Sequence, residues 1–105
     1  IQFMDRADVL MSLHATQRCF ERGITPDEVF GILITGRVIL RQRLTAPRPS
    51  ETRLGWVTRK AADGRDERRP VHVVSVDDGA GKIIVITVYW PDADRWNDDF
   101  TERRQ

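Results

Sequence analysis

The sequence has 105 residues, of which 40% are hydrophobic and 31% charged, enough for one small core under a well-solvated surface. A single cysteine excludes an internal disulfide framework, and with only two histidines a structural zinc site is not expected. No run reaches the roughly 20 apolar residues of a membrane-spanning helix, and no signal-peptide pattern is visible. We therefore expect a cytoplasmic protein without metal or cofactor.

Taken in chain order, the first expected element is a helix over about 4–22, because Val9, Leu10, Leu13 and Phe20 recur at helical spacing. A second helix is expected over about 26–35. Its start is marked by the capping box Thr25-Pro26-Asp27-Glu28, in which threonine and glutamate satisfy each other's backbone N–H groups.

After Gly36 the hydrophobic pattern changes to that of strands, and the sheet is expected over about 38–90. The expected strands are 38–40, 53–59, 71–76 and 83–90, with a charged loop over 61–70 and a hairpin turn over 77–82. Ala93, Trp96 and Phe100 then share one stripe of an expected C-terminal helix over about 92–103. The order predicts one α+β domain over 1–105, with two N-terminal helices packed on a four-stranded antiparallel sheet and a short C-terminal helix.

The net charge of +1 conceals an asymmetry. The span 37–60 contains seven basic residues and only one acidic residue, Glu51, and six of the seven are arginines, whose planar guanidinium suits phosphate recognition. Arginine excess also follows from a GC-rich genome, and Trp56 could stack on bases, although the small size of the domain favours a core anchor. The candidate nucleic-acid-binding residues are Arg37, Arg41, Arg43, Arg48, Arg53, Arg59, Lys60 and Trp56.

Candidate catalytic groups lie on the first helix and in the sheet. His14, Arg18 and Arg22 are spaced i, i+4, i+8 and form one helical ridge, where a histidine can move protons and arginines can hold a phosphate. In the sheet the candidates are His72, Thr87 and Tyr89. The alternatives are a structural histidine at each position and ordinary strand composition for the two hydroxyl residues.

The segment 14–29, HATQRCFERGITPDEV, resembles the opening of a small bacterial family, domain-of-unknown-function family 4258. The resemblance continues through 54–56, 70–74 and 86–89 and closes with Pro91-Asp92, Trp96 and 98–100. It departs at Cys19, where methionine is usual, and at Trp90, where an acidic residue is common.

The resemblance implies a layout similar to the barnase–EndoU–colicin–RelE group of small ribonucleases, which pack N-terminal helices on an antiparallel sheet. It also implies the toxin half of a toxin–antitoxin pair, whose partner is a small zinc-finger, helix-turn-helix antitoxin. The matching positions for site residues are His14, Arg18, Arg22, Thr87 and Tyr89, with His72 in the sheet.

Two hypotheses follow. The first is a metal-independent endoribonuclease of single-stranded RNA, including ribosome-bound mRNA, in which His14 transfers a proton and Arg18 and Arg22 stabilise the phosphorane. Tyr89 or His72 would then supply the second proton-transfer group. The second hypothesis is a non-catalytic nucleic-acid- or protein-binding module that uses the same arginines.

Overall fold

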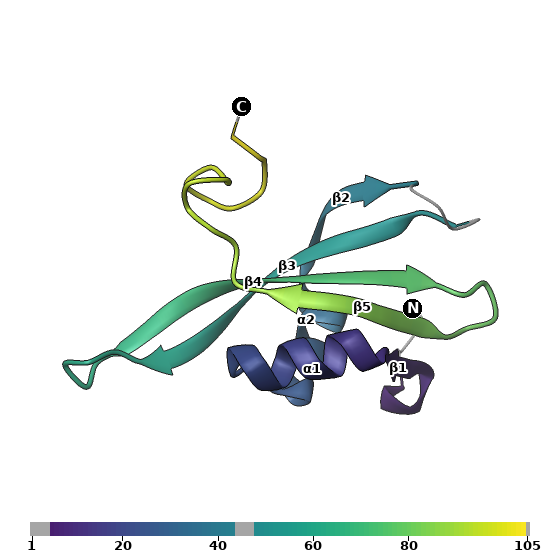
Figure 1. The fold of residues 1–105 in the computed structure, drawn as a ribbon, viewed down its shortest axis with the longest axis horizontal. Helices are drawn as coiled ribbons and strands as arrows, with labels where there is room; N and C mark the ends of the chain where they lie inside the picture. Colours follow the sequence, from purple (N-terminus) through teal and green to yellow (C-terminus); the bar gives the residue numbers. More distant parts are fainter. Residues whose placement is uncertain (1–4, 44–47, 105) are drawn as a thin grey trace.

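A computed structural model describes residues 5–43 and 48–104 of the chain. The five strands form one sheet in the order β1-β5-β4-β3-β2, in which β1 runs parallel to β5 and the other pairs are antiparallel. Helices α1 and α2 cover one face, and the C-terminal segment, residues 91–104, crosses the other (Figure 1). The elements are η1 (Arg6–Asp8), β1 (Val9–Met11), α1 (Leu13–Arg22), α2 (Pro26–Thr35), β2 (Arg37–Gln42), β3 (Ser50–Lys60), β4 (Asp66–Asp77) and β5 (Ile83–Tyr89).

The α+β class is as predicted, but the four-stranded antiparallel sheet is wrong. The fifth strand, β1, pairs with β5 in the register Val9↔Ile83 to Met11↔Val85, so the sheet is mixed. Three apolar residues in a row fit a helical stripe as well as a strand. The strand assignment is decided by a partner more than 70 residues away, which no local pattern reveals.

Helix α1 begins at Leu13, later than the predicted start near residue 4. Ser12 is its N-cap: the Ser12 Oγ accepts a hydrogen bond from the Ala15 backbone N–H at 3.0 Å and donates one to the Ile86 carbonyl of β5 at 3.2 Å. The predicted apolar face is also wrong, since Leu13 is 76% and Phe20 91% exposed. The helix instead buries Ala15 and Cys19, whose small side chains allow close approach to the sheet.

Helix α2 matches its predicted bounds and its predicted start. The Thr25 hydroxyl accepts from the Glu28 N–H at 3.1 Å, and the Glu28 carboxylate accepts from the Thr25 N–H at 3.0 Å. Ile24 before the cap and Val29 inside the helix are both buried in the core. The capping box therefore fixes where this helix starts and how it enters the core.

Strands β3 and β4 are longer than predicted and form a hairpin arm that projects beyond the helices (Figure 1). They pair from Ser50↔Val76 to Lys60↔Asp66, so half of the predicted 61–70 loop, residues 66–70, is strand. The outer part of β4 reads as a loop because it is polar and contains Pro70. Ladder hydrogen bonds and cross-strand charge pairs such as Lys60–Asp66 stabilise it as strand.

A β-bulge changes which side chains of β5 share a face. Val74 pairs with Thr87 and Ser75 pairs with Val85, which leaves Ile86 as the extra residue. Val85 and Val88 therefore both lie in the core under the helices. Strict alternation along β5, which places these two valines on opposite faces, fails at the bulge.

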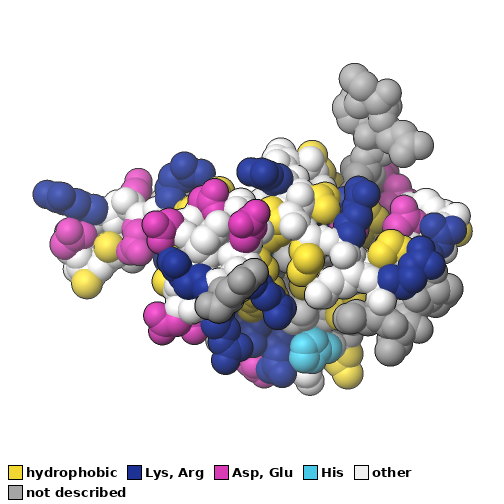
Figure 2. Space-filling view, turned by 90° about the horizontal axis from the view of Figure 1, so that it is seen from above, with side chains coloured by type: hydrophobic (Ala, Val, Ile, Leu, Met, Phe, Trp, Pro, Cys, Tyr) yellow, Lys and Arg dark blue, Asp and Glu magenta, His cyan; other side chains and the backbone are white. Residues whose placement is uncertain are grey.

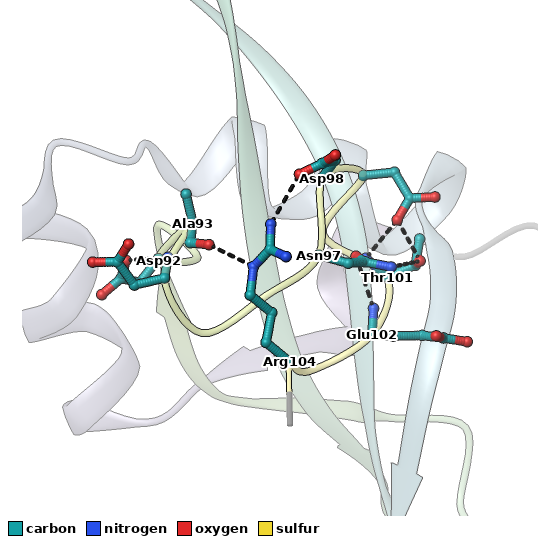
Figure 3. A network of polar contacts seen from close by, with 9 residues as sticks. Asp92, Ala93, Asn97, Asp98, Thr101, Glu102 and Arg104 are labelled. Carbon is teal, nitrogen blue, oxygen red and sulfur yellow. Dashed lines mark hydrogen bonds and ion pairs between the residues drawn. The ribbon is translucent and has the colours of Figure 1, made fainter.

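The predicted C-terminal helix is wrong. Residues 92–100 make turns, and Trp96 pairs with Arg103 in an isolated antiparallel bridge. The Asn97 side-chain carbonyl accepts from the N–H groups of Thr101 and Glu102, and the Arg104 guanidinium donates to Ala93 O and Asp98 (Figure 3). Short polar side chains such as Asn97 compete with helical backbone hydrogen bonds, which explains why the apolar spacing does not yield a helix.

No helix within residues 5–43 and 48–104 is both long and apolar enough to cross a membrane.

The hairpin arm is fastened to the helices by Arg59. Its guanidinium donates to both Glu28 oxygens at 2.6 and 2.7 Å and to the Gly23 carbonyl at 2.8 Å. Chiefly through the hydrogen bond from Arg59, the pKa of Glu28 is lowered from 4.5 to about 2. Arg59 therefore has a structural role at the junction of α1 and α2, although the sequence placed it among the nucleic-acid contacts.

Replacing Arg59 with Gln is expected to lower the free energy of unfolding by about 1–2 kcal/mol at pH 7, because it leaves a half-buried carboxylate without its partner. Since the folded pKa of Glu28 is depressed, the difference from wild type should shrink as the pH falls from 4.5 towards 2. Urea titrations measure both effects. The matched control, Lys60→Gln, breaks the exposed pair with Asp66 and should change stability by less than about 0.5 kcal/mol; equal losses in the two variants would contradict the assignment.

Candidate nucleic-acid interface

An arginine-lined cleft of about 730 Å³ opens where α1 and β5 end and the C-terminal segment begins. We call it the arginine cleft. Two elements far apart in sequence build it, since Arg22 comes from the last turn of α1 and Arg103 from the C-terminal segment. Its lining residues are Arg22, Tyr89, Trp90, Asp92, Asp94, Arg95, Trp96, Arg103 and Arg104.

Arg22 is fixed in the cleft by backbone contacts. Its guanidinium donates to the Val88 carbonyl at 2.5 Å, and its own carbonyl accepts from the Trp90 indole N–H at 2.9 Å. Trp90 is itself flanked by the guanidinium groups of Arg69 and Arg59, 4.4 and 5.6 Å from its ring centroids. The end of α1 is thus tied to the end of β5, which sets the position of the Arg22 side chain.

His72 and Tyr89 are cross-strand neighbours on the face opposite the helices. His72 is completely buried, with its Nε2 2.9 Å from the Phe100 carbonyl and its Nδ1 3.2 Å from the Tyr89 hydroxyl. A carbonyl only accepts hydrogen bonds, so Nε2 carries the ring proton and Nδ1 accepts the Tyr89 O–H. The ring also makes an edge contact with Trp96 at 4.4 Å between centroids.

Burial governs the titration of both groups. It lowers the pKa of His72 below 6.5, against a hydrogen bond to Phe100 that raises it, and the charge of Arg103 lowers it further. Burial also raises the pKa of Tyr89 above 10, against the opposing effect of Arg103. At neutral pH the pair is therefore a neutral imidazole and a protonated phenol.

Arg103 was not predicted as a site residue. The backbone bridge with Trp96 places it, and its guanidinium lies over the Trp96 ring at 5.6 Å. Within residues 5–43 and 48–104, none of the ion pairs involves Arg22, Arg95 or Arg103, although the carboxylates of Asp92 and Asp94 line the same cleft. The sequence did not indicate a site role for Arg103, because the expected C-terminal helix does not include the bridge with Trp96 that places this side chain.

Of the predicted ridge of His14, Arg18 and Arg22 on α1, only Arg22 lies in the arginine cleft. Arg22 lines the arginine cleft, whereas Arg18 makes an ion pair with Glu21 at 2.6 Å and His14 is exposed. Neither His14 nor Thr87 lines the arginine cleft or the three smaller clefts described below. Of the six predicted catalytic residues, the structure therefore gathers Arg22, Tyr89 and, behind Tyr89, His72.

Much of the predicted basic segment is neutralised within the protein. Glu51 accepts from both Arg41 and Arg53, at 2.7 and 3.0 Å, while Arg59 and Lys60 pair with carboxylates as described above. Arg43 and Arg48 are exposed. On the face that carries the C-terminal segment, basic and acidic side chains are interspersed rather than forming a continuous basic band (Figure 2).

Two residues of that segment meet in a second cleft of about 470 Å³ at the end of α2. Arg37 and Trp56 line it together with Arg68, whose guanidinium lies 5.2 Å from the Trp56 ring centroid. Trp56 is 42% exposed and makes an edge contact with Phe100, so it is neither a fully buried anchor nor an open stacking platform.

Comparison with known proteins adds one match. The family model "Domain of unknown function (DUF4258)" matches residues 11–90, which is most of the chain. The chain belongs to this family. A search of curated proteins and a search of solved structures each found no match. The DUF4258 match spans α1 to the end of β5 and so includes Arg22, His72 and Tyr89, but Arg95 and Arg103 lie beyond it.

The burial of His72 predicts how the stability of this DUF4258 protein depends on pH. Because the folded pKa of His72 lies below 6.5, the unfolded chain binds more protons, and stability should fall as the pH drops below about 6.5. Chemical denaturation between about pH 7 and pH 5 measures this slope. His72→Gln should be less stable at pH 7 and lose most of the slope, whereas the exposed control His14→Gln should keep it; parallel curves for His72→Gln and wild type would refute the prediction.

Proposed function

We propose that this protein is a metal-independent endoribonuclease of single-stranded RNA that works in the cytoplasm. The observation that carries the proposal is the convergence of Arg22, Arg103 and Tyr89 on one cleft, with the Tyr89 hydroxyl hydrogen-bonded to the His72 imidazole behind it. RNA cleavage by its own 2′-hydroxyl needs phosphate-binding cations and a route for one proton, and these groups provide both.

The arginines would bind the scissile phosphate. Guanidinium groups donate paired N–H bonds to phosphate oxygens, and Arg22 is held in place by its bond to the Val88 carbonyl. The phosphorane carries more negative charge than the phosphodiester, so Arg22 and Arg103 would stabilise the transition state more than the bound substrate. Arg95, at the exposed rim of the same cleft, would bind a neighbouring phosphate.

Tyr89 and His72 would carry the proton. As the 2′-oxygen attacks phosphorus, its proton passes to the Tyr89 oxygen, and the Tyr89 proton passes to His72 Nδ1. The bond from phosphorus to the 5′-oxygen breaks, and that oxygen takes a proton from water, leaving a 2′,3′-cyclic phosphate and a 5′-hydroxyl. The hydroxide formed from that water takes back the proton of His72 by way of Tyr89, which restores the neutral pair. Tyr89 is the catalytic residue, and His72 acts through it. Burial keeps His72 neutral at pH 7 and so able to accept a proton, although it also makes the imidazole a weaker base.

The biological role proposed with this activity is that of a toxin acting on mRNA, free or ribosome-bound, and neutralised by a zinc-finger, helix-turn-helix antitoxin. The support for this role is the resemblance of residues 14–29 and the later motifs to a family with toxin-like relatives. Expression of the wild-type chain in bacteria should slow growth, and Tyr89→Phe should relieve the effect.

Non-catalytic RNA binding is the second candidate function. One observation favours it: both ring nitrogens of His72 are already engaged, and the other histidine, His14, lies outside the clefts described. The same arginine cleft would then bind the phosphates without breaking a bond, and binding would fall steeply with salt.

The test is incubation of the purified chain with single-stranded RNA in EDTA, followed by analysis of the fragment ends. Wild type is expected to yield 2′,3′-cyclic phosphate ends. Tyr89→Phe, which keeps the ring and removes the hydroxyl, should slow cleavage by about 10²–10⁴-fold, and Arg103→Ala by about 100-fold. His14→Ala and Arg65→Ala, at exposed positions outside the arginine cleft, should cleave like wild type.

Cleavage lost in His14→Ala but retained in Tyr89→Phe would overturn this assignment in favour of the α1 ridge. Intact RNA with wild type, together with binding that is weakened by Arg103→Ala, would replace the nuclease with the binding module.

A further inference from the structure

A smaller cleft of about 270 Å³ hollows the face of the sheet opposite the helices. We call it the sheet cleft. Strands β2 to β5 all contribute to it, and the residues that line it are Leu40, Gln42, Arg48, Ser50, Thr52, Val74, Val76, Ile86, Tyr89 and Arg103.

The sheet cleft adjoins the arginine cleft. Tyr89 and Arg103 line both, so the two share a wall at the residues proposed to act on the scissile phosphate. Arg103 also lines a third hollow, beside Leu40 and Gln42. The Arg103 side chain therefore stands where the polar cleft meets the apolar face of the sheet.

The floor of the sheet cleft is apolar and its edge is polar. Leu40, Val74, Val76 and Ile86 supply aliphatic surface, and Ile86 is the extra residue of the β5 bulge. The hydroxyls of Ser50 and Thr52 and the amide of Gln42 lie along β2 and β3. A flat heterocycle with hydrogen-bonding edges matches this combination better than an alkyl chain or a sugar does.

A second arginine stands at the other rim. Arg48 lines the sheet cleft, and its guanidinium lies against Gly79 in the β4–β5 turn. Gly79 has φ +79°, which favours glycine. The apolar floor is thus bracketed by two cations, Arg103 and Arg48.

We propose that the sheet cleft is a base subsite: it takes one unpaired nucleobase of the RNA, while Arg103 and Arg48 bind the phosphates on its two sides. This inference rests on the proposed function, because the base enters beside the phosphate in the arginine cleft. Such a subsite favours single-stranded RNA, since a base inside a duplex must first be unpaired and unstacked, at a cost in free energy, before it can enter a hollow in the sheet. The amide of Gln42 would read the edge of the base; the Ser50 hydroxyl, which donates to the Gln42 backbone carbonyl at 3.3 Å, could only accept from it, and Thr52 is buried.

The test measures binding by fluorescence anisotropy in EDTA at fixed salt. One probe is a short 2′-O-methyl RNA, which cannot be cleaved through its 2′-oxygen, and the other is an abasic ribose-phosphate oligomer of the same length. Val76→Trp fills the sheet cleft from its floor, and its control, Ile34→Trp, adds the same side chain on exposed α2. Arg48→Ala has the exposed Arg65→Ala as its control. Thermal melts check that each variant folds.

Val76→Trp should weaken binding of the base-containing probe by about tenfold and leave the abasic probe unchanged. Arg48→Ala should weaken both probes, and the two controls neither. If Val76→Trp leaves the base-containing probe unaffected while Arg103→Ala weakens both probes, the base subsite is wrong and the arginine cleft stands. Equal weakening of both probes by Val76→Trp would also overturn the base subsite. If Arg103→Ala has no effect on either probe, the proposed function itself fails.

Discussion

The hydrogen bonds of one buried histidine connect the strands β4 and β5 to the C-terminal segment, and the proposed site depends on this connection. His72 joins β4 to the Tyr89 hydroxyl of β5 on one side and to the Phe100 carbonyl of the C-terminal segment on the other. Phe100 has φ +62°, which is costly for a side chain of this size, and its carbonyl is the group that His72 binds. Docking the C-terminal segment in this way places Trp96 and Arg103, and with them the arginine cleft and the wall it shares with the sheet cleft.

Arginine has two different uses in this chain, and its density in the sequence does not separate them. The basic segment 37–60 is the obvious candidate interface, yet Arg59 fastens the hairpin arm and Arg41 and Arg53 share Glu51. The cations of the arginine cleft come instead from α1 and from the C-terminal segment, whose overall charge is acidic. Whether an arginine is structural or can bind an anion depends on whether a carboxylate lies within reach of its guanidinium in the folded chain.

Local signals were reliable where the chemistry is local. The capping box at Thr25 fixed the start of α2, because its hydrogen bonds join residues only three apart. In the structure Ser12 caps α1, a start that the apolar spacing of Val9 and Leu13 did not indicate. This spacing predicted a helix where residues 9–11 form a strand, because β1 pairs with a strand at the other end of the chain. The C-terminal helix failed for a related reason, since Trp96 packs on His72, 24 positions earlier in the sequence.

The amino-acid pattern was enough to predict the α+β class, the second helix, the membership of His72, Thr87 and Tyr89 in the sheet, and the resemblance that the DUF4258 match confirms. Periodicity, caps and motifs are short-range properties, and they persist whatever the rest of the chain does. Three features became visible only in the folded chain: which arginines make no ion pair, the complete burial of His72 behind a Tyr89 that lines the cleft, and the β5 bulge that brings Ile86 to the sheet cleft. Burial and charge pairing depend on contacts between distant segments, and those exist only once the chain is folded.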